Sequence, residues 1–582
     1  MILQALKEYY DRKAVDPDSD IAPIGWEYKA IPFIVVLNSF GNLVQIEDTR
    51  ESEGTKKKAK VFCVPRSENK TSNIKANLLW EKAEYIFAGI DAQKDEKRLQ
   101  QEREAFSSRL ENQLGEFKHI QVLLSFLKEV KSERLAQEAC WGEIKEKNPY
   151  LTFRFHDEMT PLFLRPDILK KINEIKSNQL TGVANGNKTG VCLITGEPCV
   201  ISRTHSKTFI NRKNNSLVSF QKDSGYDSYG KKQGFNAPIS KTSEFAYVTA
   251  LNTLLKSPRQ RFFIGDGTYV CWSADKTNFE TEFAMIFDDP IAQDNPDLYS
   301  EKVKALLNSI KTGAFQADEG FQRFYVLGLS PGGGTRISVR FWDSRTISEY
   351  ATNIQRYFDD LSIDKPKKYP KYFALNRLLV SVAQQGDKEK LPPKLAGEVV
   401  RSIICGIPYP ESLLQASLRR IQSGIKKRLR DGRQITERVT PEIAALLKAY
   451  LNRYYQFYPI KDYREVYMSL DTNHTSIGYN LGRLFATLEH VQVKANPKIN
   501  TTIRDRYFGA ACTTPVTVFA TLLRLKNHHL TKLNRGQFIF FEKLLNEIME
   551  KISEFPPYLN LHEQGLFAIG YYHQRNKFFS NN

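Results

Sequence analysis

The change of hydrophobic pattern near residues 365–372 (KPKKYPKY) is the feature that most constrains how this chain folds. Before it, apolar runs such as TFRF, VCLITG, SLVSF and FAMIF are short and separated by glycine and polar turns, which is typical of strands. After it, apolar side chains recur at helical spacing. We therefore expect an α+β fold, in which an N-terminal mixed α/β domain is followed by a C-terminal helical bundle.

The N-terminal part carries signals for antiparallel strands and for a helical hairpin. Residues 30–47 place two apolar segments around a turn that contains Asn38 and Gly41, which predicts a β-hairpin. Between 91 and about 140, apolar residues recur at spacings of four, four and three and predict two helices; they begin with Phe106, Leu110, Leu114 and Phe117. Residues 322–342 predict two buried strands joined through Pro331 and three glycines.

The C-terminal part reads as almost wholly helical. NLGRLFATLEH, TVFATLLRLKNHHL and QFIFFEKLLNEIME each carry an apolar face at helical spacing, and three or four such helices make a bundle. No internal period of roughly 20–50 residues is present, which disfavours a solenoid. We expect an α+β domain over 1–370, a helical connecting region over 371–467 and a helical bundle over 468–582, with no strand after about residue 371.

The balance of charge points to a polyanionic partner. Basic residues outnumber acidic ones by 84 to 66, so the net charge is +18, and nucleic acid is a better candidate partner than a membrane surface. No window approaches the roughly 18 apolar residues of a transmembrane helix, and the N-terminus does not resemble a secretory signal. The seven scattered cysteines include no C-x-x-C pair, which suits a reducing compartment. We expect a cytoplasmic protein without structural disulfides.

The sequence gives no positive sign of an active site. His156 and Asp157 form an isolated pair without the further ligands of a metal-dependent phosphohydrolase, and a turn at a strand end explains them. Cys192, Cys199 and His205 are fewer than the four ligands of a structural zinc site, and the two sulfurs are too far apart for a zinc knuckle. Two small cysteines on strands are the simpler interpretation. The loop SPGGGTR lacks the lysine and Ser/Thr of a phosphate-binding P-loop. We expect no catalytic residue, metal or cofactor.

The polar segment SLVSFQKDSGYDSYGKKQGFNAPIS, residues 216–240, combines the groups by which proteins bind nucleic acid. Lysines suit phosphates, amides and hydroxyls suit base edges, and aromatic rings offer stacking surfaces. Its glycines would let the backbone approach a groove. An ordinary surface excursion between strands is the alternative. The residues expected to make contact are Ser219, Gln221, Lys222, Tyr229, Lys231, Lys232, Gln233 and Asn236.

Further polar and basic segments extend this pattern. The loop ENKTSNIKANLLW repeats the same chemistry with Lys70, Thr71, Ser72, Asn73, Lys75 and Asn77, and two such loops in one domain favour a nucleic-acid surface. The tract 419–433 holds seven cations and one acid, which suits either a phosphate-tracking surface or a solvated helix face. In the last bundle, the basic residues expected to bind a single strand are Arg504, Arg506, Arg524, Lys526, Lys532 and Arg535.

Ten stretches spread along the chain carry a resemblance to a known family. They are MILQALKEYYDR, KANLLWEKAEYIFAG, CLITGE, LVSFQKDSGYDSYGKKQGFNAP, FYVLGLSPGGGTRISVRFW, IPYPESLLQASLRRI, NRYYQ, LGRLFATLEHVQ, TIRDRYFGAACTTP and GLFAIGYYHQR. In this order, from residue 1 to residue 575, they resemble the large subunit of the type I-C CRISPR surveillance complex, Cascade. The resemblance therefore covers essentially the whole chain.

This resemblance implies a non-enzymatic subunit of an RNA-guided complex. Such a subunit would check the short motif that flanks a target in duplex DNA, the PAM, help to open the duplex, and hold the displaced strand in its helical C-terminal part. The implied partners are the guide crRNA, the backbone and crRNA-processing subunits of Cascade, and the helicase-nuclease. We assign the segment 216–240 and the loop at 70–77 to the duplex-facing surface on chemical grounds.

The resemblance also implies that the C-terminal helices can be made as a separate small subunit from an internal start. Met468 is the only methionine near the required place, and a start there would yield 115 residues with every helix of the last bundle. Two other functions remain open at this stage. One is a metal-dependent enzyme acting on nucleic acid that uses His156 and Asp157, and the other is a basic scaffold that binds RNA by charge alone.

Overall fold

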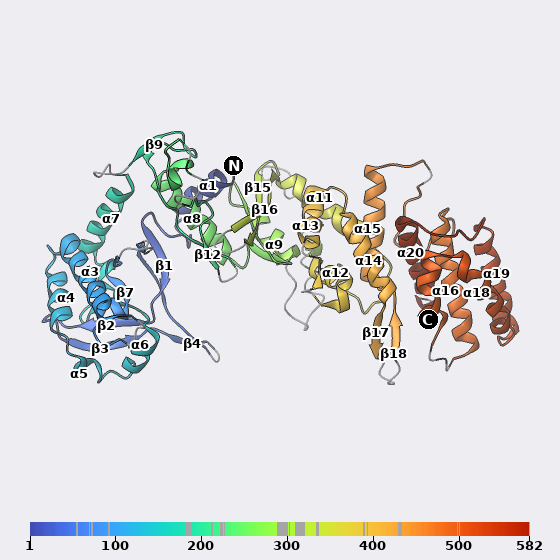
Figure 1. The fold of residues 1–582 in the computed structure, drawn as a ribbon, viewed down its shortest axis with the longest axis horizontal. Coiled ribbons are helices and arrows are strands. Elements are labelled where there is room, and N and C mark those ends of the chain that lie inside the picture. The colour runs from blue at the N-terminus through green and yellow to red at the C-terminus, as the bar shows by residue number, and fades with distance from the viewer. Residues whose placement is uncertain are drawn as a thin grey trace. The chain divides into compact units, whose positions relative to one another are not determined.

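The chain forms two compact units, which are described separately (Figure 1). The first comprises Met1–Phe209 and Asn214–Thr253, and the second comprises Ile210–Lys213 and Leu254–Asn582. The computed structural model describes residues 1–582 except 54–55, 69, 71–73, 91–93, 182–187, 211–212, 222–224, 226, 228, 288–300, 302, 306, 309–319, 333–336, 388–389, 393, 429–433, 462, 498, 500 and 581–582.

The first unit contains a four-stranded sheet in the order β3-β2-β8-β7. β2 (Phe33–Leu37) and β3 (Leu43–Asp48) form the antiparallel hairpin predicted over 30–47. β8 (Tyr150–Phe155) runs parallel to β2, and β7 (Trp80–Lys82) runs antiparallel to β8. All five residues of β2 are buried, as expected for an inner strand covered on both faces.

Helices α3 (Glu96–Leu114) and α4 (Lys118–Glu129) form the helical hairpin predicted between 91 and 140. The apolar stripe that begins at Phe106 enters the same core as the sheet, where the Phe106 ring stacks on Phe153 with 6.1 Å between centroids. The other elements up to β8 are α1 (Ile2–Ala14), β1 (Trp26–Ala30), β4 (Glu51–Glu53), β5 (Lys56–Lys58), β6 (Val61–Pro65), α2 (Ala83–Ile86), α5 (Ser132–Leu135) and α6 (Trp141–Lys147).

The stretch after β8 contains short strands between two long helices. Its elements are η1 (Leu162–Leu164), α7 (Pro166–Thr181), β9 (Thr189–Val191), β10 (Pro198–Val200), β11 (Thr208–Ile210), β12 (Lys213–Asn215), η2 (Gln233–Asn236) and α8 (Lys241–Lys256). The strand predicted for SLVSF, residues 216–220, is wrong, because these residues have no regular structure. Instead, the Ser216 hydroxyl donates a hydrogen bond to the carbonyl of His205 (2.8 Å) and holds the segment against its neighbour.

The second unit begins with an antiparallel sheet in the order β13-β14-β15-β16. Its strands are β13 (Arg261–Ile264), β14 (Gly267–Ser273), β15 (Arg323–Pro331) and β16 (Ile337–Thr346), and the last two confirm the strand pair predicted over 322–342. Only β15 is buried as predicted, because β16 is half-buried or exposed except at Phe341. The strand predicted for FAMIF is wrong, because these residues end the helix α9 (Phe279–Phe287). The buried Phe279, Phe283 and Phe287 are four residues apart, a helical spacing that the short apolar run concealed.

Helices dominate the rest of the second unit, but strands do not stop at residue 371 as predicted. The helix α14 (Glu411–Ser423) ends where Gly424 has a left-handed φ of +67°, and the hairpin of β17 (Ile425–Arg428) and β18 (Gln434–Glu437) follows. The basic tract 419–433 is therefore not one helix face. The helices before the last bundle are α11 (Ile347–Asp360), α12 (Leu375–Val382), η3 (Gln384–Gly386), α13 (Leu395–Cys405), α14 (Glu411–Ser423) and α15 (Pro441–Phe457).

The last bundle contains the predicted helices, packed around the pair of α16 (Ile477–Ala495) and α20 (Leu561–Ser580). Glycines let the two backbones touch: a Cβ at Gly482 would lie 2.0 Å from the carbonyl oxygen of Phe567, and one at Gly570 would lie 2.1 Å from that of Tyr479. The bundle helices are α16 (Ile477–Ala495), α17 (Ile503–Thr513), α18 (Val516–Leu530), α19 (Arg535–Met549) and α20 (Leu561–Ser580).

One hydrophobic core joins the bundle to the preceding sheet. Phe324 of β15 and Tyr572 of α20 belong to the same buried cluster, and the Tyr572 hydroxyl donates to the carbonyl of Asp364 (2.7 Å). The boundary expected near 365–372 thus falls inside the second unit, whereas the compact units divide between Thr253 and Leu254. Among the helices of the described residues, none is both long and apolar enough to span a bilayer.

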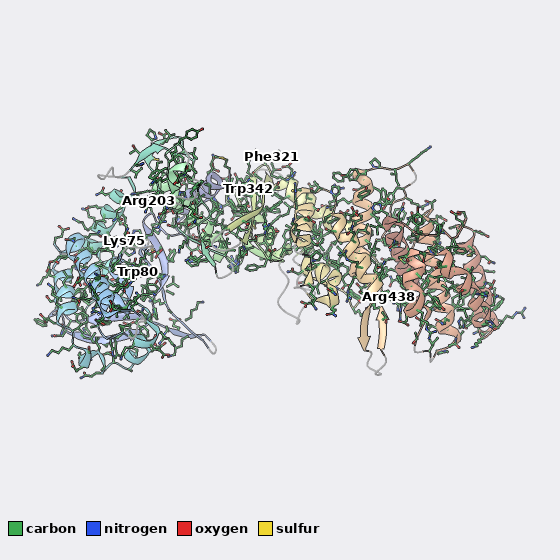
Figure 2. The ribbon with its side chains drawn as sticks, viewed as in Figure 1. Lys75, Trp80, Arg203, Phe321, Trp342 and Arg438 are labelled. Atoms are coloured by element: carbon green, nitrogen blue, oxygen red, sulfur yellow. The ribbon has the colours of Figure 1, made fainter. Side chains whose placement is uncertain are left out.

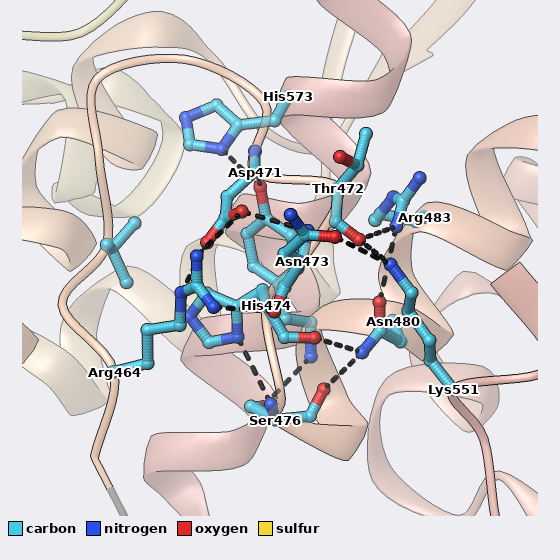
Figure 3. A network of polar contacts seen from close by, with 12 residues as sticks. Arg464, Asp471, Thr472, Asn473, His474, Ser476, Asn480, Arg483, Lys551 and His573 are labelled. Carbon is cyan, nitrogen blue, oxygen red and sulfur yellow. Dashed lines mark hydrogen bonds and ion pairs between the residues drawn. The ribbon is translucent and has the colours of Figure 1, made fainter.

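Hydrogen bonds connect the segment before α16, residues 472–474, to the bundle (Figure 3). Arg483 of α16 donates to the carbonyl of Thr472 (3.2 Å), and Lys551 donates to the side-chain oxygen of Asn473 (3.4 Å). Asn480 donates to the carbonyl of His474 (2.7 Å). The loop that follows Met468 is therefore bonded to the helices C-terminal to it.

Candidate nucleic-acid interface

Two cavities in the first unit adjoin each other and share Arg203 and Thr204 in their linings. The larger, which we call the basic cavity, has a volume of about 370 Å³, and the smaller, the small cavity, has about 180 Å³. The basic cavity is lined by Gly25, Arg66, Ser67, Glu68, Lys75, Lys176, Gln179, Leu180, Ser202, Arg203, Thr204, Ser206, Lys241 and Glu244. The small cavity is lined by Arg203, Thr204, His205, Lys207, Ser216, Val218, Ser219, Phe220, Gln233 and Gly234.

Five cations from separate segments line the basic cavity, with two carboxylates among them. Arg66 follows β6 and donates to the hydroxyl of Ser206 (2.5 Å), while its guanidinium lies 3.2 Å from the Glu244 carboxylate. Lys241, at the start of α8, donates to the carbonyl of Gln179 (3.1 Å). Because basic side chains outnumber acidic ones here, the cavity suits an anionic group such as a phosphate.

Lys176 of α7 is the buried member of this group. Its side-chain nitrogen donates to the carbonyl of Arg66 (3.1 Å). Burial lowers the pKa of Lys176 to about 8, although the nearby Glu68 acts in the opposite direction. The positive charge on Lys176 therefore depends on pH near neutrality, and an anion bound in the cavity would stabilise it.

The segment 216–240 contributes predicted residues to the small cavity. Ser219 and Gln233 line it, and the Gln233 side-chain oxygen accepts a hydrogen bond from Arg203 (2.6 Å). Gln233 has a left-handed φ of +51°, and the neighbouring Tyr229, which is 98% exposed, has a φ of +50°. Such backbone conformations are strained for non-glycine residues and cluster at functional sites. Of the residues predicted in this segment, Ser219 and Gln233 thus line a cavity and Tyr229 has a fully exposed ring.

The other predicted residues of this segment lie outside the two cavities. Among them, Gln221, Lys231 and Lys232 have exposed side chains. The Asn236 amide donates to the carbonyls of Lys231 (3.2 Å) and Gln233 (3.0 Å), so it stabilises the turn from within. Lys222 lies outside the described residues.

The loop at 70–77 contributes one predicted residue to the basic cavity, Lys75. Figure 2 labels Lys75 and Arg203, which also lines this cavity. Lys70 forms an ion pair with the buried Glu81 (2.5 Å) and lies over the Tyr85 ring. Asn77 is buried, and its side-chain oxygen accepts from the backbone N–H of Glu68 (3.0 Å). Thr71, Ser72 and Asn73 lie outside the described residues. Lys75 is thus the described member of this loop that lines a cavity.

The structure adds residues that sequence reasoning missed. They are Arg66, Lys176, Arg203, Lys207 and Lys241, together with His205, which the sequence suggested only as a possible metal ligand. Arg203, His205 and Lys207 come from the stretch ISRTHSK, whose basic and hydroxyl-bearing residues resemble those of the predicted loops and could have drawn attention. The remaining three are single cations far apart in sequence, which only the fold brings together.

The six basic residues predicted to bind a displaced strand have different surroundings. Arg506, Arg524, Lys532 and Arg535 are exposed, and Lys526 forms an ion pair with Glu542 (3.0 Å). Arg504 is only 6% exposed and lies 3.3 Å from the Glu489 carboxylate inside the bundle. Because an approaching strand cannot reach a buried, paired guanidinium, Arg504 supports the bundle rather than the exposed basic surface.

Among the residues that the structure describes, no cluster of three or more His, Cys, Asp or Glu side chains could hold a metal ion. His156 and Asp157 follow β8 in a turn, as predicted. Cys192 follows β9 and Cys199 lies in β10, and all seven cysteines are free thiols.

The fold and the cavities define an α+β protein with a concave cationic surface in its first unit and a helical bundle at the end of its second. A comparison with protein families matches residues 6–579 to the family described as CRISPR-associated protein (Cas_Csd1), and the chain belongs to this family. This finding confirms the resemblance to the type I-C large subunit and makes the chain a CRISPR-associated Cascade component. No curated protein matches the chain.

Proposed function

We propose that this chain is the non-catalytic large subunit of a type I-C CRISPR interference complex that recognises the PAM in duplex DNA. It aids strand separation and stabilises the R-loop. The observation that carries the proposal is the meeting of five cavity-lining cations with the amide of Gln233 and the ring of Phe220 across two adjoining cavities. Phosphate-binding and base-reading groups side by side suit a protein that reads a few base pairs while the guide reads the rest.

The proposed partners follow from this role. They are the guide crRNA, duplex DNA, the displaced single strand, the backbone and crRNA-processing subunits of Cascade, and the helicase-nuclease, all in the cytoplasm. The exposed Arg506, Arg524, Lys532 and Arg535 of the last bundle are the candidates for contact with the displaced strand.

Matched substitutions in the segment 216–240 test whether this surface reads bases. Gln233→Ala should make the complex accept flanking base pairs that the wild type rejects, because each good base contact is worth about 1–3 kcal/mol. Lys231→Ala and Lys232→Ala should weaken binding to all flanks alike, and each should reduce the salt slope by about one unit. The measurement is binding of the reconstituted complex to a set of flanking sequences at several salt concentrations. Identical behaviour of all three variants would show that the segment does not read bases.

A cleavage assay tests the non-catalytic part of the proposal. Purified protein incubated with duplex or single-stranded DNA and Mg²⁺ or Mn²⁺ should bind the DNA and leave it intact. Cleavage that His156→Ala and Asp157→Ala abolish would support the competing nuclease function instead.

We further propose that Met468 starts a separate small subunit. The loop after Met468 is bonded to α16 and to Lys551, so a product of 468–582 would keep these contacts (Figure 3). Expression of the native gene should give a short second product on a gel, and the Met468→Ala gene should not. The absence of a short product from both genes would contradict this proposal.

A further inference from the structure

The small cavity has the size and lining of a site for one planar heterocycle. Its volume of about 180 Å³ is below the roughly 300–1,000 Å³ of pockets that enclose drug-sized ligands. Val218 and Phe220 supply an apolar side and a ring, whereas His205, Ser219 and Gln233 supply polar groups. Proteins that hold an unstacked nucleobase combine an aromatic ring with hydrogen-bonding groups in this way.

His205 brings a buried imidazole to this lining. The side chain is 6% exposed, and its Nδ1 lies 2.5 Å from the hydroxyl oxygen of Tyr247. Burial lowers the pKa of His205, so the ring is neutral at pH 7. Its Nε2 has no hydrogen-bond partner among the described residues. His205 therefore adds a buried, neutral imidazole to the wall of the cavity.

Gln233 and Arg203 add donors that are already oriented. The Gln233 oxygen accepts from Arg203, which fixes the amide and leaves its N–H groups for a ring nitrogen or carbonyl of a base. Arg203 and Lys207 are both exposed and line the cavity, so phosphates attached to the bound base would meet positive charge. The adjoining basic cavity continues this charge through the shared Arg203.

We propose that the small cavity holds one unstacked nucleobase of a single-stranded segment, with the neighbouring phosphates over the basic cavity. A base within a duplex is stacked on both faces, so it must leave the helix to enter. The inference rests on the proposed function and deepens it: the surface engages an unpaired nucleotide next to the duplex. The nucleotide can come from the guide RNA or from an opened DNA strand, since both present the same base and phosphate chemistry.

Shielding of a fluorescent base tests this inference on the full-length chain. Short single-stranded RNA, single-stranded DNA and duplex DNA, each with one 2-aminopurine at successive positions, are titrated with protein, and quenching by acrylamide is measured. One position in RNA or in single-stranded DNA should become shielded, and the strand type identifies the source of the nucleotide. Phe220→Ala should abolish the shielding and weaken binding of that strand roughly 5- to 150-fold, the value of one base stacked on an aromatic ring.

A matched control and separate outcomes keep the inference distinct from the proposed function. Phe40→Ala removes an exposed ring that is absent from the cavity lining, and it should leave both shielding and affinity unchanged. Binding without shielding at any position would overturn the nucleobase site and leave the nucleic-acid surface intact. Failure of the wild-type chain to bind any of the three probes would overturn both.

Discussion

Lys176 gives the proposed interface a pH dependence that can be measured. Because its pKa in the free protein is about 8, raising the pH from 7 to 9 removes its positive charge from the basic cavity. Binding of duplex DNA by the wild type should therefore weaken over this range. Lys176→Arg, which stays protonated, should bind with a flatter pH profile. Fluorescence anisotropy at constant ionic strength gives the comparison, and equal slopes for the two proteins would remove Lys176 from the interface.

Removal of one partner from a buried ion pair in the second unit should strongly destabilise the protein. Arg453 is fully buried, and its Nε donates to the Asp360 carboxylate (2.7 Å). Asp360→Ala leaves this guanidinium without its counter-charge and should lower the free energy of unfolding by about 3–5 kcal/mol. As a control, Glu96→Ala breaks an exposed pair with Arg103 and should cost at most about 1 kcal/mol. Equal losses in urea unfolding would contradict this account.

From residue types in the sequence we could predict which chemical groups the candidate site contains. We could not predict which of these side chains face the cavity and which are buried. The segment 216–240 does supply Gln233 to a cavity, but Asn77 and Arg504 are buried and bonded within the protein. Their partners lie on other helices or turns, so no local pattern reveals whether a polar side chain faces solvent. For the same reason the sequence did not reveal Arg203 or Lys176 as cavity residues.

At the scale of elements, the packing of α16 on α20 makes a sharp prediction. Gly482→Ala would place a Cβ against the Phe567 carbonyl, so the helices must move apart, at a cost of about 1–3 kcal/mol. Gly509→Ala lies in α17 with no atom within 4 Å of the new Cβ and should be neutral or stabilising by up to about 1 kcal/mol. Thermal unfolding distinguishes the two, and similar melting temperatures would show that the helices pack more loosely than described.

Elements with a regular apolar repeat or a clear turn signal could be predicted from the sequence, and short runs without either could not. The helices α3 and α4 and the bundle helices follow from periodicity. The hairpin of β2 and β3 follows from two apolar segments around a turn. The prediction of a strand for FAMIF was wrong because five consecutive apolar residues fit a strand as well as the end of a helix. The hairpin of β17 and β18 was not predicted because its strands are charged and are stabilised by pairing with each other. Their sequences have no alternation of apolar residues that would indicate a strand.

At the scale of the whole molecule, the position of the basic residues says more about the binding partner than the net charge of +18 does. Net charge alone predicts attraction to any polyanion and no sequence preference. The first unit concentrates part of this charge in a cavity beside amide, imidazole and aromatic groups, which adds the means to discriminate bases. The boundary between compact units near residue 253 assigns this surface to a unit with its own sheet and core.

The structure of the reconstituted complex on a duplex target tests the central claim most directly. The account predicts that the base pairs flanking the target lie against the first unit, with Arg203, Gln233 or Lys241 within hydrogen-bond distance of DNA, at about 3 Å. A flank that rests against the second unit or another subunit, with both cavities facing away from nucleic acid, would contradict it.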